Sequence, residues 1–243
     1  VTFDGGALAT DEVNVTIANA ATTYALHSTG VEILRVDSNA AAATTVSVAN
    51  ATGIKTIEVD QGADVATQTF TVAGLTGSET LVLKASDDNT AAANEHILVA
   101  TLADASGSAD TIGFKVGSGT SDAGARLQTL DIETVSINAD AAADLDLTNL
   151  SMTAATDVMS LTVTGDSALT VSGLNADVTS IDASGMTAGG SVVQGARSAT
   201  TASTYTGSDG NDTFILVHGG DVIAAGAGTG DTLDVDKAAI LGG

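Results

Sequence analysis

A short strand-like pattern recurs along this 243-residue chain and constrains its fold more than any other feature. In each copy, apolar residues alternate with polar ones, and the copy closes on Asp, Asn, Ser or Gly. Alternation with a period of two is typical of a strand with one buried face. The clearest copies are VEILRVD (31–37), IKTIEVD (54–60), LQTLDIETVSIN (127–138), VMSLTVTG (158–165) and VTSIDASG (178–185).

The spacing between copies indicates how the strands stack. Leu34 and Ile57 are 23 residues apart, Val135 and Leu161 are 26 apart, and Leu161 and Ile181 are 20 apart. Self-similarity at such a period is typical of a solenoid, in which each coil buries its apolar face against its neighbours. We therefore predict an all-β fold: a right-handed β-solenoid, similar to a parallel β-helix. The alternative is a series of β-sandwich modules, although the absence of Pro is unusual for their hairpin turns.

Composition excludes several classes of function. The chain has 7 basic and 30 acidic residues and a net charge of −23, so nucleic acid is not an expected partner. It has no Cys, which excludes disulfides and thiolate metal sites. No apolar run is long enough to predict a membrane span. Aromatic residues make up only 2%, which suits a narrow stack better than a wide globular core.

Two stretches poor in strand patterns suggest how the chain is divided. One is loop-like (102–126), and the other is small and polar (185–204). We predict a β-rich segment over 1–107, a β-solenoid over 108–204, and a Gly- and Asp-rich tail over 205–243. The start at VTFDGG, without Met, and the end at LGG suggest a fragment of a longer protein.

The tail contains three similar units that carry the candidate site. They are GSDGNDTFI (207–215), LVHGGDVIA (216–224) and AGAGTGDTLDV (225–235). The aspartates Asp212, Asp221 and Asp231 fall in phase, and an apolar residue stands two positions after each of them. The units resemble the nonapeptide G-G-x-G-x-D-x-U-x of RTX proteins, which binds Ca²⁺ in a parallel β-roll. Ser208 replaces the second Gly of the first unit.

This resemblance predicts a calcium site with a specific geometry. One turn of such a roll takes two units, so Asp212 and Asp231 should lie on the same edge, one coil apart, and Asp221 on the opposite edge. A Ca²⁺ ion between stacked loops would be bound by carboxylates and backbone carbonyls. Asp209 is a further candidate ligand, and the turn glycines of the site are Gly207, Gly210, Gly219 and Gly228. The alternative is a series of solvated turns without an ion.

A wider resemblance covers about half of the chain, from residue 108 to residue 235. The motifs ADTIGFKVG, LDIETVSIN, LTVTGDSALTVSG and VTSIDASGMTAG, followed by YTGSDGNDTFI, resemble the C-terminal part of RTX-type bacterial surface-layer proteins. The resemblance implies an extracellular location at the bacterial cell surface and export by type I secretion. It also implies Ca²⁺-dependent folding and self-association into a lattice or filament, with a cell-surface glycan or lipopolysaccharide as a further candidate partner. The Gly/Asp block is shorter than in that family.

No catalytic motif emerges from the sequence. His27, His96 and His218 are widely separated, and neither a His-Glu-x-x-His nor a Gly-x-Ser-x-Gly motif occurs. We therefore expect a structural surface protein rather than an enzyme. Two alternatives are a stalk or binding segment of a large RTX adhesin, and the accessory calcium-binding tail of a secreted RTX enzyme.

Overall fold

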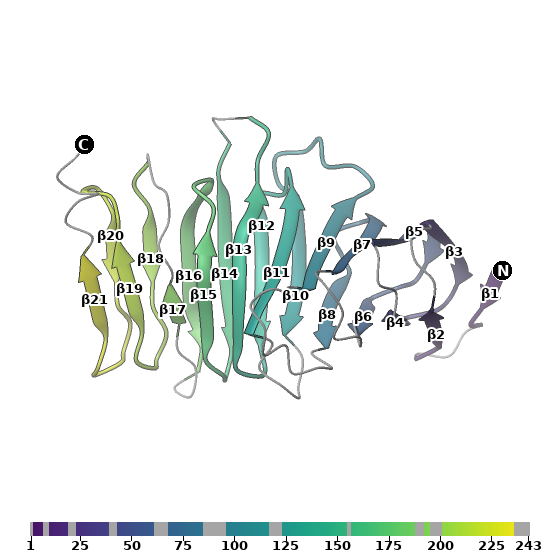
Figure 1. The fold of residues 1–243 in the computed structure, drawn as a ribbon, viewed down its shortest axis with the longest axis horizontal. Coiled ribbons are helices and arrows are strands. Elements are labelled where there is room, and N and C mark those ends of the chain that lie inside the picture. Colours follow the sequence, from purple (N-terminus) through teal and green to yellow (C-terminus); the bar gives the residue numbers. More distant parts are fainter. Residues whose placement is uncertain are drawn as a thin grey trace.

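Parallel strands build the whole of the described fold (Figure 1). The structure is a computed structural model that describes residues 2–6, 10–18, 23–38, 43–60, 68–84, 96–116, 123–154, 157–187, 192–194 and 201–235. Within these ranges it contains 21 strands and no helix. No described segment is therefore a helix that could cross a membrane.

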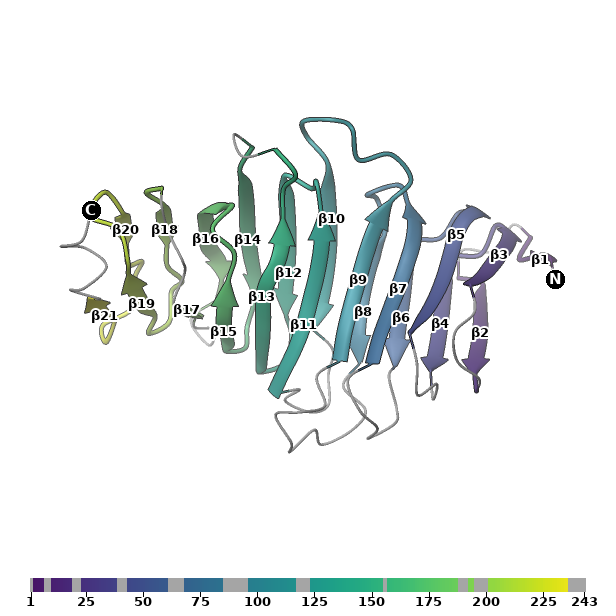
Figure 2. The same ribbon diagram turned by 45° about the horizontal axis from the view of Figure 1, so that its top comes forward.

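The strands alternate between two sheets as the chain advances. Odd-numbered strands form an 11-stranded sheet and even-numbered strands a 10-stranded sheet, each in sequence order. Figure 2 shows odd- and even-numbered strands together along the whole length of the stack. Every described strand pair is parallel, so each coil contributes one strand to each sheet. This arrangement confirms the β-solenoid and differs from the antiparallel sandwich alternative.

The odd sheet contains β1 (Thr2–Asp4), β3 (Thr23–Thr29), β5 (Thr44–Thr52), β7 (Gln68–Leu75), β9 (His96–Leu102), β11 (Ala123–Leu130), β13 (Ala143–Ser151), β15 (Leu169–Leu174), β17 (Val192–Gln194), β19 (Thr213–Leu216) and β21 (Thr232–Val235). The even sheet contains β2 (Glu12–Ile17), β4 (Ile33–Ser38), β6 (Thr56–Asp60), β8 (Thr80–Lys84), β10 (Thr111–Val116), β12 (Thr134–Ala139), β14 (Met159–Gly165), β16 (Val178–Met186), β18 (Thr204–Thr206) and β20 (Val222–Ala224).

The spacings between the strand copies in the sequence correspond to residue pairs in the even sheet. Leu34 pairs with Ile57 between β4 and β6, and Leu161 of β14 pairs with both Val135 of β12 and Ile181 of β16. All five side chains are buried, in a core built mainly from Val, Ile and Leu. A one-residue slip would turn each strand's apolar residues to solvent, so the alternating pattern specifies this register.

Two expectations about secondary structure need correction. The segment 127–138 is not one strand: β11 ends at Leu130, the chain turns at Asp131 with a φ of 55°, and β12 begins at Thr134 in the other sheet. The zone expected to be loop-like (102–126) contains β10 and the beginning of β11. Both sheets also continue across residues 107/108 and 204/205, where the sequence suggested divisions.

Candidate functional site

The first Gly/Asp unit forms a buried turn that leads into β19. Asp212 immediately precedes this strand, and only 1% of its surface is exposed. Its carboxylate accepts a hydrogen bond of 2.7 Å from the backbone N–H of Ser208, and the Ser208 hydroxyl lies 2.9 and 3.0 Å from its two oxygens. Ser208, which replaces a glycine of the RTX pattern, therefore gives the buried carboxylate a local partner.

Asp231 lies one coil beyond Asp212, on the same edge of the odd sheet. Strands β19 and β21 pair with Thr213 opposite Thr232, which brings the two preceding aspartates side by side. The backbone N–H of Asp212 donates to Oδ1 of Asp231 at 3.0 Å. The structure thus gives the two aspartates the placement that the sequence predicted.

Asp221 occupies the opposite edge, because it precedes β20 in the even sheet. Its Oδ1 accepts a hydrogen bond of 2.8 Å from the backbone N–H of Ser203, in the preceding coil. Its Oδ2 accepts bonds from the backbone N–H groups of Val217 and His218, at 3.3 and 3.0 Å. Asp221 therefore closes its own turn and links it to the coil before it.

Glycines allow the two turns on the Asp212 edge to stack closely. A Cβ on Gly207 would overlap the carbonyl oxygen of Ala225, and a Cβ on Gly228 would overlap that of Gly210. Gly226 has a φ of 96° and lies against the carbonyl of Ser208. The carbonyl oxygens of Ala225 and Gly210 thus lie directly against the glycines that precede Asp212 and Asp231.

This set of groups has the chemistry of a hard-cation site. Carboxylate and carbonyl oxygens are the ligands that Ca²⁺ prefers, and Asp212, Asp231, Ser208, Gly210 and Ala225 supply them here. These are the kinds of group that Ca²⁺ prefers, and both oxygens of the Asp212 carboxylate already accept hydrogen bonds from Ser208. In the described ranges no three His, Cys, Asp or Glu side chains gather into one cluster, so the set combines two carboxylates with backbone carbonyls.

The remaining predicted residues lie at the margin of these turns. Asp209 is exposed, at the tip of the first turn. Gly219 is exposed in the turn before Asp221, on the opposite edge from Gly207 and Gly228. Gly210 donates its backbone N–H to the Ser208 hydroxyl at 3.0 Å.

Acidic residues elsewhere make the same coil-to-coil contact, which the sequence analysis missed. Glu32 accepts the backbone N–H of Asp11 at 2.9 Å, Glu133 accepts that of Asp110 at 2.7 Å, and Asp177 accepts that of Met152 at 2.9 Å. Each of the three acids immediately precedes an even strand, as Asp221 does. The available signal was an acid directly before the first residue of a strand, as in the run IETVSIN.

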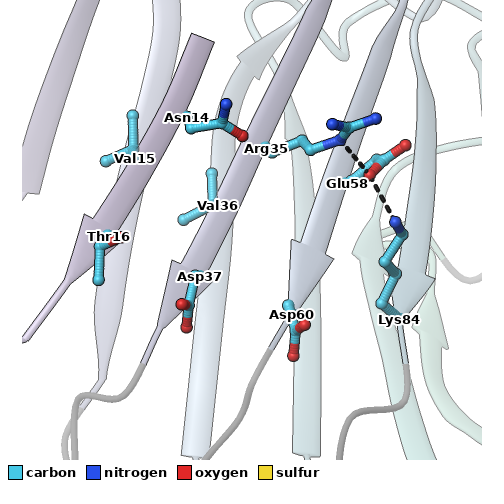
Figure 3. Close-up of a pocket in the computed structure, with 9 residues that line it drawn as sticks. All are labelled: Asn14, Val15, Thr16, Arg35, Val36, Asp37, Glu58, Asp60 and Lys84. Carbon is cyan, nitrogen blue, oxygen red and sulfur yellow. Dashed lines mark hydrogen bonds and ion pairs between the residues drawn. The ribbon is translucent and has the colours of Figure 1, made fainter. Parts of the chain in front are cut away.

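A second feature outside the predicted site is a row of charges on the outer face of the N-terminal even strands. Arg35 bonds Glu12 through Nη1 and Glu58 through Nε, the latter at 2.7 Å, and Lys84 Nζ lies 2.8 Å from the same Glu58 oxygen. Figure 3 shows three of these side chains, Arg35, Glu58 and Lys84, beside a groove of about 220 Å³. We call Glu12, Arg35, Glu58 and Lys84 the charge ladder.

The ladder shifts the pKa values of two of its members. Burial alone would raise the pKa of Glu58, but hydrogen bonds from Lys84 and Arg35 outweigh this effect and hold the pKa below its usual value. The hydrogen bond to Glu58 raises the pKa of Arg35. Both groups are therefore charged at neutral pH.

Comparison with known proteins adds no assignment: no family model, curated protein or solved structure matches this chain.

Proposed function

We propose that this chain is a structural building block of an extracellular assembly at the bacterial cell surface, and that calcium strengthens its C-terminal coils. The observation that carries the proposal is the edge on which Asp212 and Asp231 lie one coil apart, with glycine turns packed between them. The carboxylates and turn carbonyls on this edge are oxygen groups, which suit Ca²⁺. The resemblance of the tail units to RTX nonapeptides supports the same ion.

The solenoid suits a load-bearing or lattice-forming role. Each coil contacts only its neighbours, so length is gained by adding coils rather than by enlarging one core. The net charge of −23 keeps separate copies apart. A divalent cation that neutralises aspartates would therefore favour both coil stacking and contact between copies.

The free energy supplied by one ion can be estimated from ordinary extracellular sites. Such sites have Kd values of about 10⁻⁴ to 10⁻³ M. At about 1 mM Ca²⁺ and a Kd of about 0.1 mM, binding would stabilise the fold by about 1.4 kcal/mol per site. An effect of this size is measurable as a shift in thermal unfolding.

Calcium titration calorimetry on three single variants and one double variant tests the site. Asp212→Ala and Asp231→Ala should abolish the same binding event, and the double variant should lose no more than either single one. Asp221→Ala should leave that event in place, because this residue lies on the other edge. Independent, additive losses from Asp212→Ala and Asp231→Ala would contradict a shared ion, and absence of calcium heat in the wild type would refute the site.

Electron microscopy with and without Ca²⁺ tests the assembly. Sheets or filaments that form in millimolar Ca²⁺ and dissolve in EGTA are the expected result. A monodisperse monomer under both conditions would argue against self-association even if the ion binds. The two experiments therefore test the calcium site and the assembly separately.

A further inference from the structure

The charge ladder alternates in sign along four adjacent strands. Its order is Glu12, Arg35, Glu58 and Lys84, contributed by β2, β4, β6 and β8. Reading the ladder in reverse exchanges every negative charge for a positive one. The ladder runs obliquely across the strands, because Arg35 pairs with Asn14 rather than Glu12, and Glu58 pairs with Val82 rather than Lys84. A second copy turned by a two-fold axis through the middle of the ladder, oblique to the strands, would therefore bring each charge opposite its complement.

We propose that this face is a docking surface for a second copy of the same chain, in a two-fold symmetric dimer. Arg35 of each copy would then face Glu58 of the other, and Glu12 would face Lys84. An isologous contact of this kind requires a self-complementary patch, and an alternating row of charges is one. Complementary charge across an interface sets orientation and excludes other arrangements.

The distribution of cations favours this face over the rest of the surface. The chain has only 7 Lys and Arg residues, so copies that carry a net charge of −23 repel each other over most orientations. Three of the seven, Arg35, Lys84 and Lys115, belong to β4, β8 and β10 of the same sheet. The Arg35 and Lys84 side chains are 43% and 42% exposed, so both can reach a partner.

The shape of the face agrees with a contact at the ladder. The groove of about 220 Å³ beside Arg35 and Glu58 adjoins a second groove, of about 410 Å³. The two grooves share Glu58 and Lys84, and the second extends to Lys115 and Asp140. These hollows can admit the long side chains of the second copy.

One pair of residues opposes the contact. Asp37 and Asp60 stand in register on β4 and β6, beside the ladder, and Oδ1 of Asp60 is buried with no hydrogen-bond partner in the part of the chain that the structure describes. In the dimer they would add negative charge beside the contact, and like charges across an interface repel. Removing one of these charges should tighten the dimer.

The inference names one contact of the self-association proposed above and rests on it only in part. The dimer needs no calcium, whereas the proposed sheets or filaments do. Calcium-dependent sheets without a ladder dimer would overturn this contact and leave the assembly intact. A ladder dimer that forms no calcium-dependent sheets would support this contact and argue against the assembly.

Sedimentation of the full chain in EGTA tests the dimer with charge-reversal variants. The wild type should dimerise at low salt and dissociate at high salt, because exposed charges are screened. Arg35→Glu alone and Glu58→Arg alone should each weaken self-association by at least about tenfold, since each places like charges opposite each other. An equal mixture of the two variants should form heterodimers, because the introduced glutamate of one variant would then face the introduced arginine of the other.

Two controls keep the test decisive. Arg126→Glu makes the same charge change on the odd sheet, where Arg126 pairs with Asp146, and should leave the dimer unchanged. Asp60→Asn should tighten the dimer without altering the ladder itself, and its result stands even if the reversal variants fail to fold by circular dichroism. A monomeric wild type at low salt, or no change with Asp60→Asn and no heterodimer in the mixture, would overturn the proposal.

Discussion

The backbone N–H of Asp212 donates a hydrogen bond of 3.0 Å to the carboxylate of Asp231, one coil further along the solenoid. Two aspartates on one edge would otherwise repel each other. Here the charge of Asp231 faces an amide dipole, while the charge of Asp212 faces the N–H and hydroxyl of Ser208. Four other carboxylates also accept a backbone N–H from the preceding coil: those of Glu32, Glu133, Asp177 and Asp221. Amide donors therefore stabilise negative charge at several coils of the solenoid.

The bond between Asp212 and Asp231 should contribute to stability without any ion. Asp231→Ala removes a charged acceptor and is expected to cost about 1–2 kcal/mol of unfolding free energy in EGTA. Asp231→Asn keeps an oxygen acceptor and should cost less. Urea denaturation measures both, with Asp234→Ala as the control, because Asp234 is exposed on the same strand. Equal effects from Asp231→Ala and Asp234→Ala would show that the bond contributes nothing.

The register of the even sheet could be predicted because the alternation of large apolar residues determines it. Leu34, Ile57, Leu161 and Ile181 are large, buried and part of an alternating pattern, so their spacing in the sequence is the spacing of the coils. The edge positions of Asp212 and Asp231 came from the resemblance to RTX units, two of which make one turn of a roll. The local sequence pattern was sufficient to predict strand register where successive coils repeat the same alternation.

The corner at Asp131 shows where local pattern fails. Ile132 is fully buried and keeps the alternation of apolar residues going between β11 and β12, so the sequence reads as one strand. The structure shows the turn in the positive φ of Asp131 and in the assignment of β11 and β12 to different sheets. The charge ladder was missed for a different reason. Arg35 and Glu58 follow the paired Leu34 and Ile57 by one residue, but Glu12 and Lys84 lie outside the strand copies that the sequence shows.

Close stacking at Gly207 predicts a second mutational effect. Gly207→Ala would place a methyl group against the carbonyl of Ala225 and 2.6 Å from Oδ2 of Asp212. We expect a cost of about 1–3 kcal/mol, since the neighbouring coil must shift. Gly113→Ala is the matched control, because its nearest neighbour, the Thr80 hydroxyl, would lie at an ordinary 3.6 Å. Thermal unfolding should separate the two variants, and equal melting temperatures would contradict the packing of this turn.

Removing the hydroxyl of Tyr205 is expected to stabilise the fold. Tyr205 is 1% exposed and packs against Phe214 with ring centroids 6.2 Å apart, and its buried hydroxyl has no hydrogen-bond partner among the described residues. Tyr205→Phe removes an unsatisfied polar group and should stabilise the fold by about 1 kcal/mol. Tyr205→Leu also removes the ring and should destabilise it. A loss of stability in Tyr205→Phe, measured by urea denaturation, would mean that the hydroxyl is bonded in solution.

The lowered pKa of Asp146 makes the free energy of unfolding depend on pH. Burial by itself raises the pKa of Asp146, but hydrogen bonds from the hydroxyl and backbone of Thr148 and the contact with Arg126 outweigh it, so the pKa is lowered. A lowered pKa in the folded state means that the contribution is complete above the unfolded value, about 3.9, and is lost as pH falls through the folded value. Solvent screening limits the contribution to about 1 kcal/mol or less.

Thermal unfolding of the wild type and Asp146→Asn between about pH 2 and pH 6 checks this expectation. The variant should be less stable than the wild type at pH 6, and the two curves should converge at the acidic end, where the wild-type carboxylate is protonated. Thr148→Val removes the hydroxyl donor at 2.6 Å and should reproduce part of the difference. Parallel curves across the whole range would contradict the lowered pKa, because a group with the same proton affinity in both states adds no pH dependence.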